Sequence, residues 1–222
     1  MGYLDELKRQ ADAERAKHTL DTGALERNML LADAACHSTS RYFGTLAQQL
    51  NVLQPLSRAV YRFDKNTSFT NLKLTAFRAD SRLKKLRSTE VFDFVVLSFQ
   101  LKTGSRISLA KDFPPAIDKL EAKLQQCGTP FESEIVRDPN GRFLEKRFQF
   151  VADFNGYVRL LPDHDTGWVR FQIVNLDGFE TVTVAFPATE VGSGRLDELA
   201  RWIVGEPNTF LKDGHELRRI EA

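Results

Sequence analysis

The hydrophobic period of the chain changes near Pro55, and this change constrains the fold more than any other feature of the sequence. Before Pro55, apolar residues recur at alternating steps of four and three, and after it most recur at every second position. The first spacing keeps side chains on one stripe of an α-helix, whereas the second alternates them across a β-strand. The sequence therefore predicts an α+β fold, in which helices pack on a mainly antiparallel β-sheet.

The residues before Pro55 are predicted to form two helices. Residues 3–19 form a charged helix with a thin apolar stripe, and residues 21–23 can end it and cap the next, which runs over 24–53. We expect residues 1–54 to form a helical arm or hairpin packed on a main body of residues 55–222, all within one globular unit. The stripe of the second helix consists of Leu25, Met29, Ala32, Cys36, Thr39, Phe43, Leu46, Leu50 and Leu53.

Candidate strands after Pro55 cover residues 58–64, 71–79, 90–102 and 106–110. The third of these carries apolar side chains on both faces, which predicts an internal strand covered on both sides. Its two faces consist of Phe92, Phe94 and Val96 on one side and Val95, Leu97, Phe99 and Leu101 on the other.

A meander of strands follows, with one dry and one wet face. Asn140-Gly141, Asn155-Gly156 and Asp177-Gly178 predict its turns. Two shorter helices accompany the sheet, one near Ile117–Leu124 and one near Leu196–Ile203. Because each follows several strands and ends in Gly-x-Pro, a duplicated strands-then-helix unit is one interpretation, and common helix capping is the other.

Composition restricts the function classes. The chain has 31 Lys and Arg against 30 Asp and Glu, a net charge of +1, which argues against a strong global field for nucleic acid or an anionic membrane. Cys36 and Cys127 match no metal or redox spacing, so we expect reduced, buried thiols. No apolar run reaches membrane-spanning length. We expect a cytoplasmic protein without a metal, a cofactor or a membrane partner.

Three segments, Leu109–Pro115, Val174–Val182 and Arg195–Trp202, resemble an uncharacterised family of bacterial, mainly proteobacterial, proteins. The resemblance extends over most of the chain. It implies a location in the bacterial cytosol, and it carries no activity, cofactor or catalytic residue that would transfer to this sequence.

Asp163-His164-Asp165 is the short motif in this sequence that most resembles a catalytic or ligand-binding group. Carboxylates beside an imidazole can orient a base or contribute to a ligand or metal site. Neighbouring residues in a hairpin rarely point at one centre, however, and the stretch from Pro162 to Gly167 is rich in turn-forming residues. We therefore predict a turn, and expect His164→Ala to leave ligand and metal affinity unchanged.

The main basic concentration lies within residues 78–87, and its cations are Arg78, Arg82, Lys84, Lys85 and Arg87. Such a segment can contact phosphates. No aromatic residue interleaves with it, so nucleic-acid binding is the less favoured hypothesis. We predict a solvated hairpin or a charged edge strand, because Lys and Arg commonly protect sheet edges.

The long apolar stripe before Pro55 has two interpretations. It can form a coiled-coil seam between chains, which would make a homodimer. Ala32, Cys36 and Thr39 weaken such a seam, and the apolar surface around it is broad, so packing across the chain's own sheet is favoured. The residues of the candidate interface are Leu4, Leu7, Leu25, Met29, Phe43, Leu46 and Leu50.

The sequence contains no familiar nucleotide, serine-hydrolase or zinc-protease motif, and we assign no catalytic residue. The predicted function is a non-enzymatic cytoplasmic binding or assembly module that acts through protein–protein contacts, using residues 3–53 or the wet sheet face. The alternative is a small apolar ligand held between the Phe-rich sheet and the helices. A hydrolase or transferase that uses scattered carboxylates is the third hypothesis.

Overall fold

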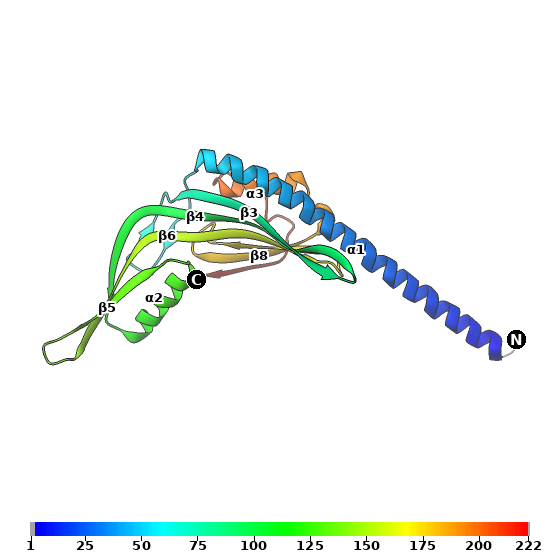
Figure 1. The fold of residues 1–222 in the computed structure, drawn as a ribbon, viewed down its shortest axis with the longest axis horizontal. Coiled ribbons are helices and arrows are strands. Elements are labelled where there is room, and N and C mark those ends of the chain that lie inside the picture. Colours follow the sequence, from blue (N-terminus) through cyan, green and yellow to red (C-terminus); the bar gives the residue numbers. More distant parts are fainter. Residues whose placement is uncertain (1–2, 222) are drawn as a thin grey trace.

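The chain folds as a long N-terminal helix on a mainly antiparallel sheet, so the predicted α+β class is confirmed (Figure 1). The computed structural model describes residues 3–221, and the side chains in that range apart from those of residues 3–5 and 13–20. Among the described residues, no helix is both long and apolar enough to cross a membrane.

Helix α1 runs without interruption over Tyr3–Leu53, a length of 51 residues. The predicted break at residues 21–23 is therefore wrong, and the described part of the front end is one helix with no hairpin. The reason is that one glycine inside a helix costs only about 1 kcal/mol relative to alanine, and the residues after Gly23 are strong helix formers. The helix ends before Pro55, where Gln54 adopts a φ of 44°.

The main sheet has seven strands in the order β3-β4-β6-β7-β8-β9, and β5 pairs with the first half of β6. All pairings are antiparallel. The strands are β3 (Lys73–Leu86), β4 (Thr89–Lys111), β5 (Phe131–Arg137), β6 (Phe143–Asp163), β7 (Trp168–Val174), β8 (Glu180–Pro187) and β9 (His215–Glu221). Strands β1 (Tyr61–Arg62) and β2 (Ser68–Phe69) form a separate pair.

Two predicted strand boundaries are wrong, because β4 and β6 are single long strands. The predicted strands 90–102 and 106–110 join across a register shift between Lys102 and Arg106. Asn155-Gly156, predicted as a hairpin turn, lies in the middle of β6. Gly156 is needed there for space, because a Cβ at this position would lie 2.4 Å from the ring of Phe99. The turns at residues 140–141 and 177–178 are present.

The sheet has one dry face, as predicted. Every second residue of β6 from Phe148 to Leu160 is buried, and these side chains join the core with those of β4, β7 and β8. Helix α1 packs against β3, β4, β6 and β7 on this side, and also contacts α3 (Ser193–Ile203). We call the opposite side the outer face; it is defined by Phe94, Val96, Tyr157, Arg159 and the residues in register with them.

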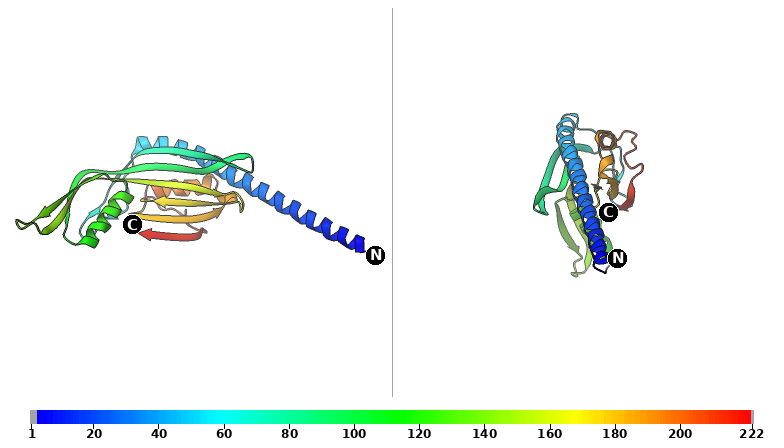
Figure 2. Two further views of the ribbon diagram at one scale, coloured as in Figure 1. Left: turned by 60° about the horizontal axis from the view of Figure 1, so that its bottom comes forward. Right: turned by 90° about the vertical axis from the view of Figure 1, so that its right-hand side faces the viewer.

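The two shorter helices occupy different places. Helix α2 (Pro114–Gln126) contacts β4 and lies near β5, whereas α3 lies beside α1 and follows the 3₁₀ turn η1 (Ala188–Glu190) (Figures 1 and 2). Their similar capping patterns therefore accompany different packing, and the topology lends no support to a duplicated unit.

Candidate functional site

The triplet Asp163-His164-Asp165 begins at the last residue of β6 and continues into the turn before β7, so the predicted turn is present. The Asp163 carboxylate accepts hydrogen bonds from the backbone N–H groups of Asp165 at 3.1 Å and Thr166 at 3.3 Å. Burial alone would raise the pKa of Asp163, but these hydrogen bonds outweigh it and lower the pKa. The carboxylate is thereby used in shaping the turn.

His164 is a core residue in this turn, only 4% exposed. Its Nε2 donates to the carbonyl of Phe92 at 2.8 Å, so Nε2 carries a proton. Nδ1 is buried without a hydrogen-bond partner among the described residues. The imidazole thus connects the turn to β4. Among the described residues, no group of three or more potential metal ligands lies close together, here or elsewhere.

Asp165 connects the turn to two other elements. Its carboxylate pairs with Arg87 at the tip of the β3–β4 hairpin. Its carbonyl accepts a hydrogen bond of 2.8 Å from Nδ2 of Asn28 on α1. Near this joint, Asp33 of α1 accepts the backbone N–H of Phe92 at 3.0 Å. The triplet is therefore a structural junction at which helix, hairpin and turn meet.

The basic segment lies on β3, which is an edge strand of the sheet, as predicted. Near the tip of the hairpin, Arg82 and Lys84 both approach Asp93, at 3.7 and 3.2 Å. Lys85 is exposed, and Arg78 stands opposite Ser98, which in turn faces Tyr157. Arg78 therefore lies in a row that crosses the outer face.

The candidate interface residues separate into two groups. Phe43 and Leu50 are buried and Leu46 is partly buried against the core, so this part of the seam packs on the chain's own sheet. Leu25 and Met29, nearer the N-terminus, are partly buried. The favoured intramolecular packing is confirmed for the part of the seam that contains Phe43 and Leu50. Leu7 is 43% exposed, and the side chain of Leu4 lies outside the described residues.

The N-terminal part of α1 projects from the body as an arm, which we define as residues 3–27 (Figures 1 and 2). The left view of Figure 2, turned by 60° from that of Figure 1, shows the same projection, so it is not an effect of the viewing direction. Within the arm, the described side chains of residues 6–12 and 21–23 are exposed. Past Asn28 the same helix lies on the sheet.

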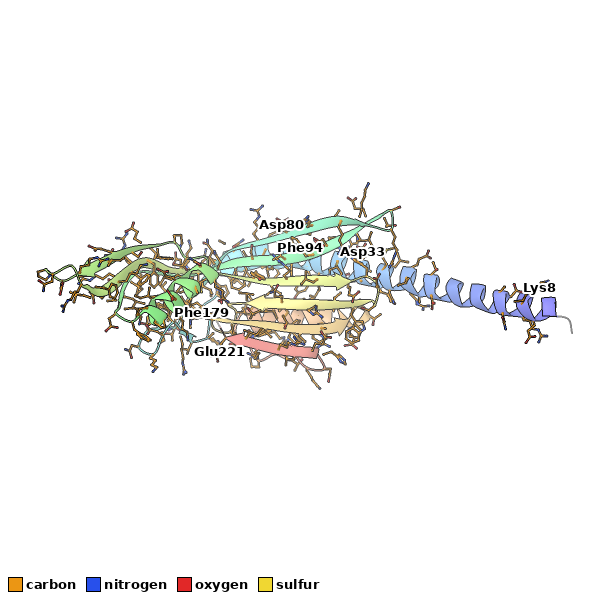
Figure 3. All side chains as sticks on the ribbon, turned by 90° about the horizontal axis from the view of Figure 1, so that it is seen from below. Lys8, Asp33, Asp80, Phe94, Phe179 and Glu221 are labelled. Carbon is orange, nitrogen blue, oxygen red and sulfur yellow. The ribbon has the colours of Figure 1, made fainter. Side chains whose placement is uncertain are left out.

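The outer face carries an arrangement that sequence reasoning missed. The guanidinium carbon of Arg159 lies 4.9 Å from the ring centroid of Phe94 and 5.2 Å from that of Tyr157. No helix of the described chain covers this part of the face, and Figure 3 shows it from the side opposite α1, with Phe94 and Asp80 labelled. The predicted covering of β4 on both sides is therefore wrong here: the guanidinium of Arg159 contacts the Phe94 ring, and no second layer of the described chain covers it.

A hollow of about 480 Å³ opens at one end of the outer face. Trp168 and His215 meet there edge to face with ring centroids 4.9 Å apart. Arg170 pairs with Glu216 at 2.8 Å on its rim. Glu216 adopts a φ of 51°, so the start of β9 is held in an uncommon backbone conformation beside the hollow.

Two groups of phenylalanine rings pack together in the core. Phe63, Phe154 and Phe179 contact one another with centroids 4.8–6.0 Å apart. A second group, Phe171, Phe186 and Phe210, has centroids 5.2–6.1 Å apart. All six of these phenylalanines belong to the hydrophobic core.

Lys123 is a buried cation with a structural explanation. Its Nζ donates to the carbonyls of Arg62 at 3.0 Å and Phe63 at 3.2 Å. The ammonium also lies 5.1 Å from the ring centroid of Phe179. Burial lowers the pKa of this lysine. The side chain therefore fixes α2 to the segment around β1, and its donors are used in that role.

Comparisons of the chain with family models, with curated proteins and with solved structures found no match.

Proposed function

We propose that the protein is a non-enzymatic binding or assembly module that presents the arm of α1 to a protein partner. The observation that carries this proposal is the continuity of α1: one helix packs on the sheet with its second half and projects freely with its first. A helix gains most of its stability from tertiary packing. A projecting arm without such packing gains stability when a partner covers it.

The spacing of apolar residues in the arm suits recognition in a groove. Leu4, Leu7 and Ala11 stand at positions i, i+3 and i+7, the pattern by which an amphipathic helix anchors in an apolar groove. Leu7 and Ala11 are exposed in the free chain. The remainder of the arm is charged with both signs, which suits the polar rim of such an interface.

The junction with the body supports a fixed presentation of the arm. Asn28 bonds the turn between β6 and β7, and Asp33 bonds the backbone of β4. The same helix continues from these anchors into the arm, so the anchors set its direction. We place the module in the cytoplasm, in keeping with its reduced cysteines, and self-association through the arm is a second form of the same proposal.

A single substitution on the arm tests the proposal in the full chain. Leu7→Glu places a charge on the apolar stripe, and Gln10→Glu places the same charge on an exposed position next to it. Neither side chain is in the core, so both variants should keep the wild-type unfolding midpoint. Light scattering of purified protein measures self-association, and affinity purification from the source cells followed by mass spectrometry measures partner binding.

We expect Leu7→Glu to lose a stoichiometric partner or a dimer that Gln10→Glu retains. The proposal fails if wild-type protein is monomeric and partner-free, or if both variants keep the same assembly as the wild type.

A further inference from the structure

We propose that the outer face of the sheet binds single-stranded nucleic acid. This inference is independent of the arm, because it rests on side chains from β3, β4, β6, β7 and β9. Strand register places them in rows across the face. One row contains Arg78, Ser98, Tyr157, Val174, Thr181 and Ile220, and the next contains Asp80, Val96, Arg159, Gln172, Thr183 and Arg218.

The face is cationic, although the whole chain is nearly neutral. It carries seven cationic side chains, Arg78, Arg82, Arg159, Arg170, Arg218, Lys73 and Lys102, against five acidic ones, Asp80, Asp93, Asp153, Asp163 and Glu216. Arg82 and Arg170 have acidic partners at its end. Arg78, Arg159 and Arg218 form no ion pair within the described part of the chain. These three cations are available to phosphate groups, which they would contact with release of counterions.

Arg159 is the central residue of the proposed site. Arg159 is half-buried, its guanidinium contacts the rings of both Phe94 and Tyr157, and its Nε is buried without an acceptor among the described residues. Contact with two rings limits the rotamers that the guanidinium can adopt. A restrained, partly desolvated guanidinium without a carboxylate suits a phosphate oxygen, which accepts such hydrogen bonds in a bidentate geometry.

The aromatic residues favour nucleic acid over a simple polyanion. Phe94 and Tyr157 are half-buried, and Trp168 lines the hollow at the end of the same face. Every base has a π-face, so rings interleaved with arginines are typical of surfaces that bind single strands. A duplex keeps its base faces stacked, and an acidic peptide has no bases to stack on the rings. Neither would use the rings.

The sequence disfavours nucleic acid because residues 78–87 contain no aromatic side chain. Pairing of β3 with β4, and of β4 with β6, changes that assessment. It places Phe94 opposite Arg82 and Tyr157 opposite Ser98, beside Arg78. Aromatic and cationic side chains therefore alternate between neighbouring strands, although they do not alternate along the basic segment itself.

Fluorescence anisotropy with the full chain tests the proposal. The probes are a labelled oligothymidylate, a labelled oligouridylate, a hairpin duplex of similar charge and labelled polyglutamate, each titrated at low and moderate salt. Tyr157→Leu keeps an apolar side chain and removes the ring, and Arg159→Lys keeps the charge and removes the planar fork. Arg41→Gln, an exposed arginine of α1 on the other side of the sheet, is the matched control. Urea midpoints confirm that each variant is folded.

We expect both single-stranded probes to bind, and Tyr157→Leu to weaken them about fivefold or more, the lower range for the loss of one stacked base. Arg159→Lys should weaken them as well, whereas Arg41→Gln and the arm variant Leu7→Glu should bind as the wild type does. The double variant with Arg78→Gln and Arg218→Gln should reduce the salt slope by about 0.7 for each phosphate that the protein no longer neutralises.

Three results would overturn the proposal. One is no binding of either single strand up to about 100 µM protein, the weak end of non-specific affinity. Another is equal binding of the duplex with no effect of Tyr157→Leu. The third is polyglutamate binding that matches the single strands, which would mark a general anion surface for acidic proteins.

Discussion

The side-chain amide of Asn51 holds the backbone of Phe77 by two hydrogen bonds in opposite directions. Nδ2 of Asn51 donates to the Phe77 carbonyl, and Oδ1 accepts the Phe77 N–H, each at 2.8 Å. Phe77 lies where β3 shifts register against β4, next to Ala76 with a φ of 53°. The last turns of α1 therefore satisfy backbone groups that the bulge withdraws from the strand pairing.

Asn51→Ala should lower the free energy of unfolding by about 1–3 kcal/mol, because it leaves a backbone donor and acceptor without their partners. Urea unfolding followed by circular dichroism measures the change. Gln49→Ala, an exposed substitution in the same turn of α1, serves as the control and should stay within about 0.5 kcal/mol of the wild type. Equal midpoints for both variants would contradict the role assigned to Asn51.

Gly156→Ala should destabilise the sheet by about 1–3 kcal/mol through overpacking. The added methyl group would lie 2.4 Å from the Phe99 ring and 3.0 Å from the carbonyl of Val174. Gly44→Ala is the matched control. Gly44 lies within α1, and a Cβ at this position would meet no atom within 4 Å. This substitution should leave stability unchanged or raise it, as alanine favours the helix.

A second variant separates crowding by Phe99 from the loss of glycine itself. Phe99→Leu combined with Gly156→Ala should recover part of the stability lost by Gly156→Ala alone. The leucine side chain is smaller and leaves space for the methyl group of Ala at position 156. Strict additivity of the two changes in unfolding free energy would show that the ring is not the cause.

His164→Ala should lower the free energy of unfolding by about 1–3 kcal/mol, because the Phe92 carbonyl loses its donor and a cavity remains in the turn. Metal content, measured by elemental analysis after incubation with zinc, should be the same in the variant and the wild type. A zinc ion retained by the wild type and lost by His164→Ala would contradict the structural role.

Acid should destabilise the protein partly through Asp64. Burial alone would raise the pKa of Asp64, but hydrogen bonds from Lys111 and from the backbone of Asn66 and Thr67 lower it from 3.8 to about 2. A carboxyl whose folded pKa is depressed stabilises the fold above its ordinary pKa, and this stabilisation is lost as the pH falls through the folded value. The loss therefore falls between about pH 4 and pH 2.

Asp64→Asn removes this titration. Urea midpoints of the variant should change less than those of the wild type over that pH range, by the equivalent of about 2 kcal/mol. Asp118→Asn, an exposed position on α2, should follow the wild-type profile. Parallel curves for the wild type and Asp64→Asn would exclude the ion pair with Lys111 as a source of acid sensitivity.

The spacing of apolar residues was sufficient to predict which side of α1 and which face of the sheet are buried, because apolar residues at the helix or strand period fall on one side of the element. It failed at Gly23 and at Asn155-Gly156. Glycine favours breaks and turns only as a local tendency. At Gly156 the packing of Phe99 decides the conformation, and that contact joins residues 57 positions apart.

The candidate sites were predictable to a smaller extent. The exposed arm and the turn at Asp163–Asp165 follow from the residues themselves. The grouping of Arg159 with Phe94 depends on the pairing of β4 with β6 across 65 positions. The sequence shows which residues belong to a wet face, but it does not show which strands lie side by side, so the grouping was missed.

Because α1 is uninterrupted, the number of residues in the arm determines the direction in which its apolar side points. From Asn28 to Tyr3 the helix rises about 38 Å at 1.5 Å per residue, so its tip stands at a set distance from the sheet. Each residue also turns the helix by about 100°. Deleting a single residue from the arm would therefore shorten it only slightly and point its apolar side in a different direction. The length of the arm, as well as its composition, specifies what the tip faces.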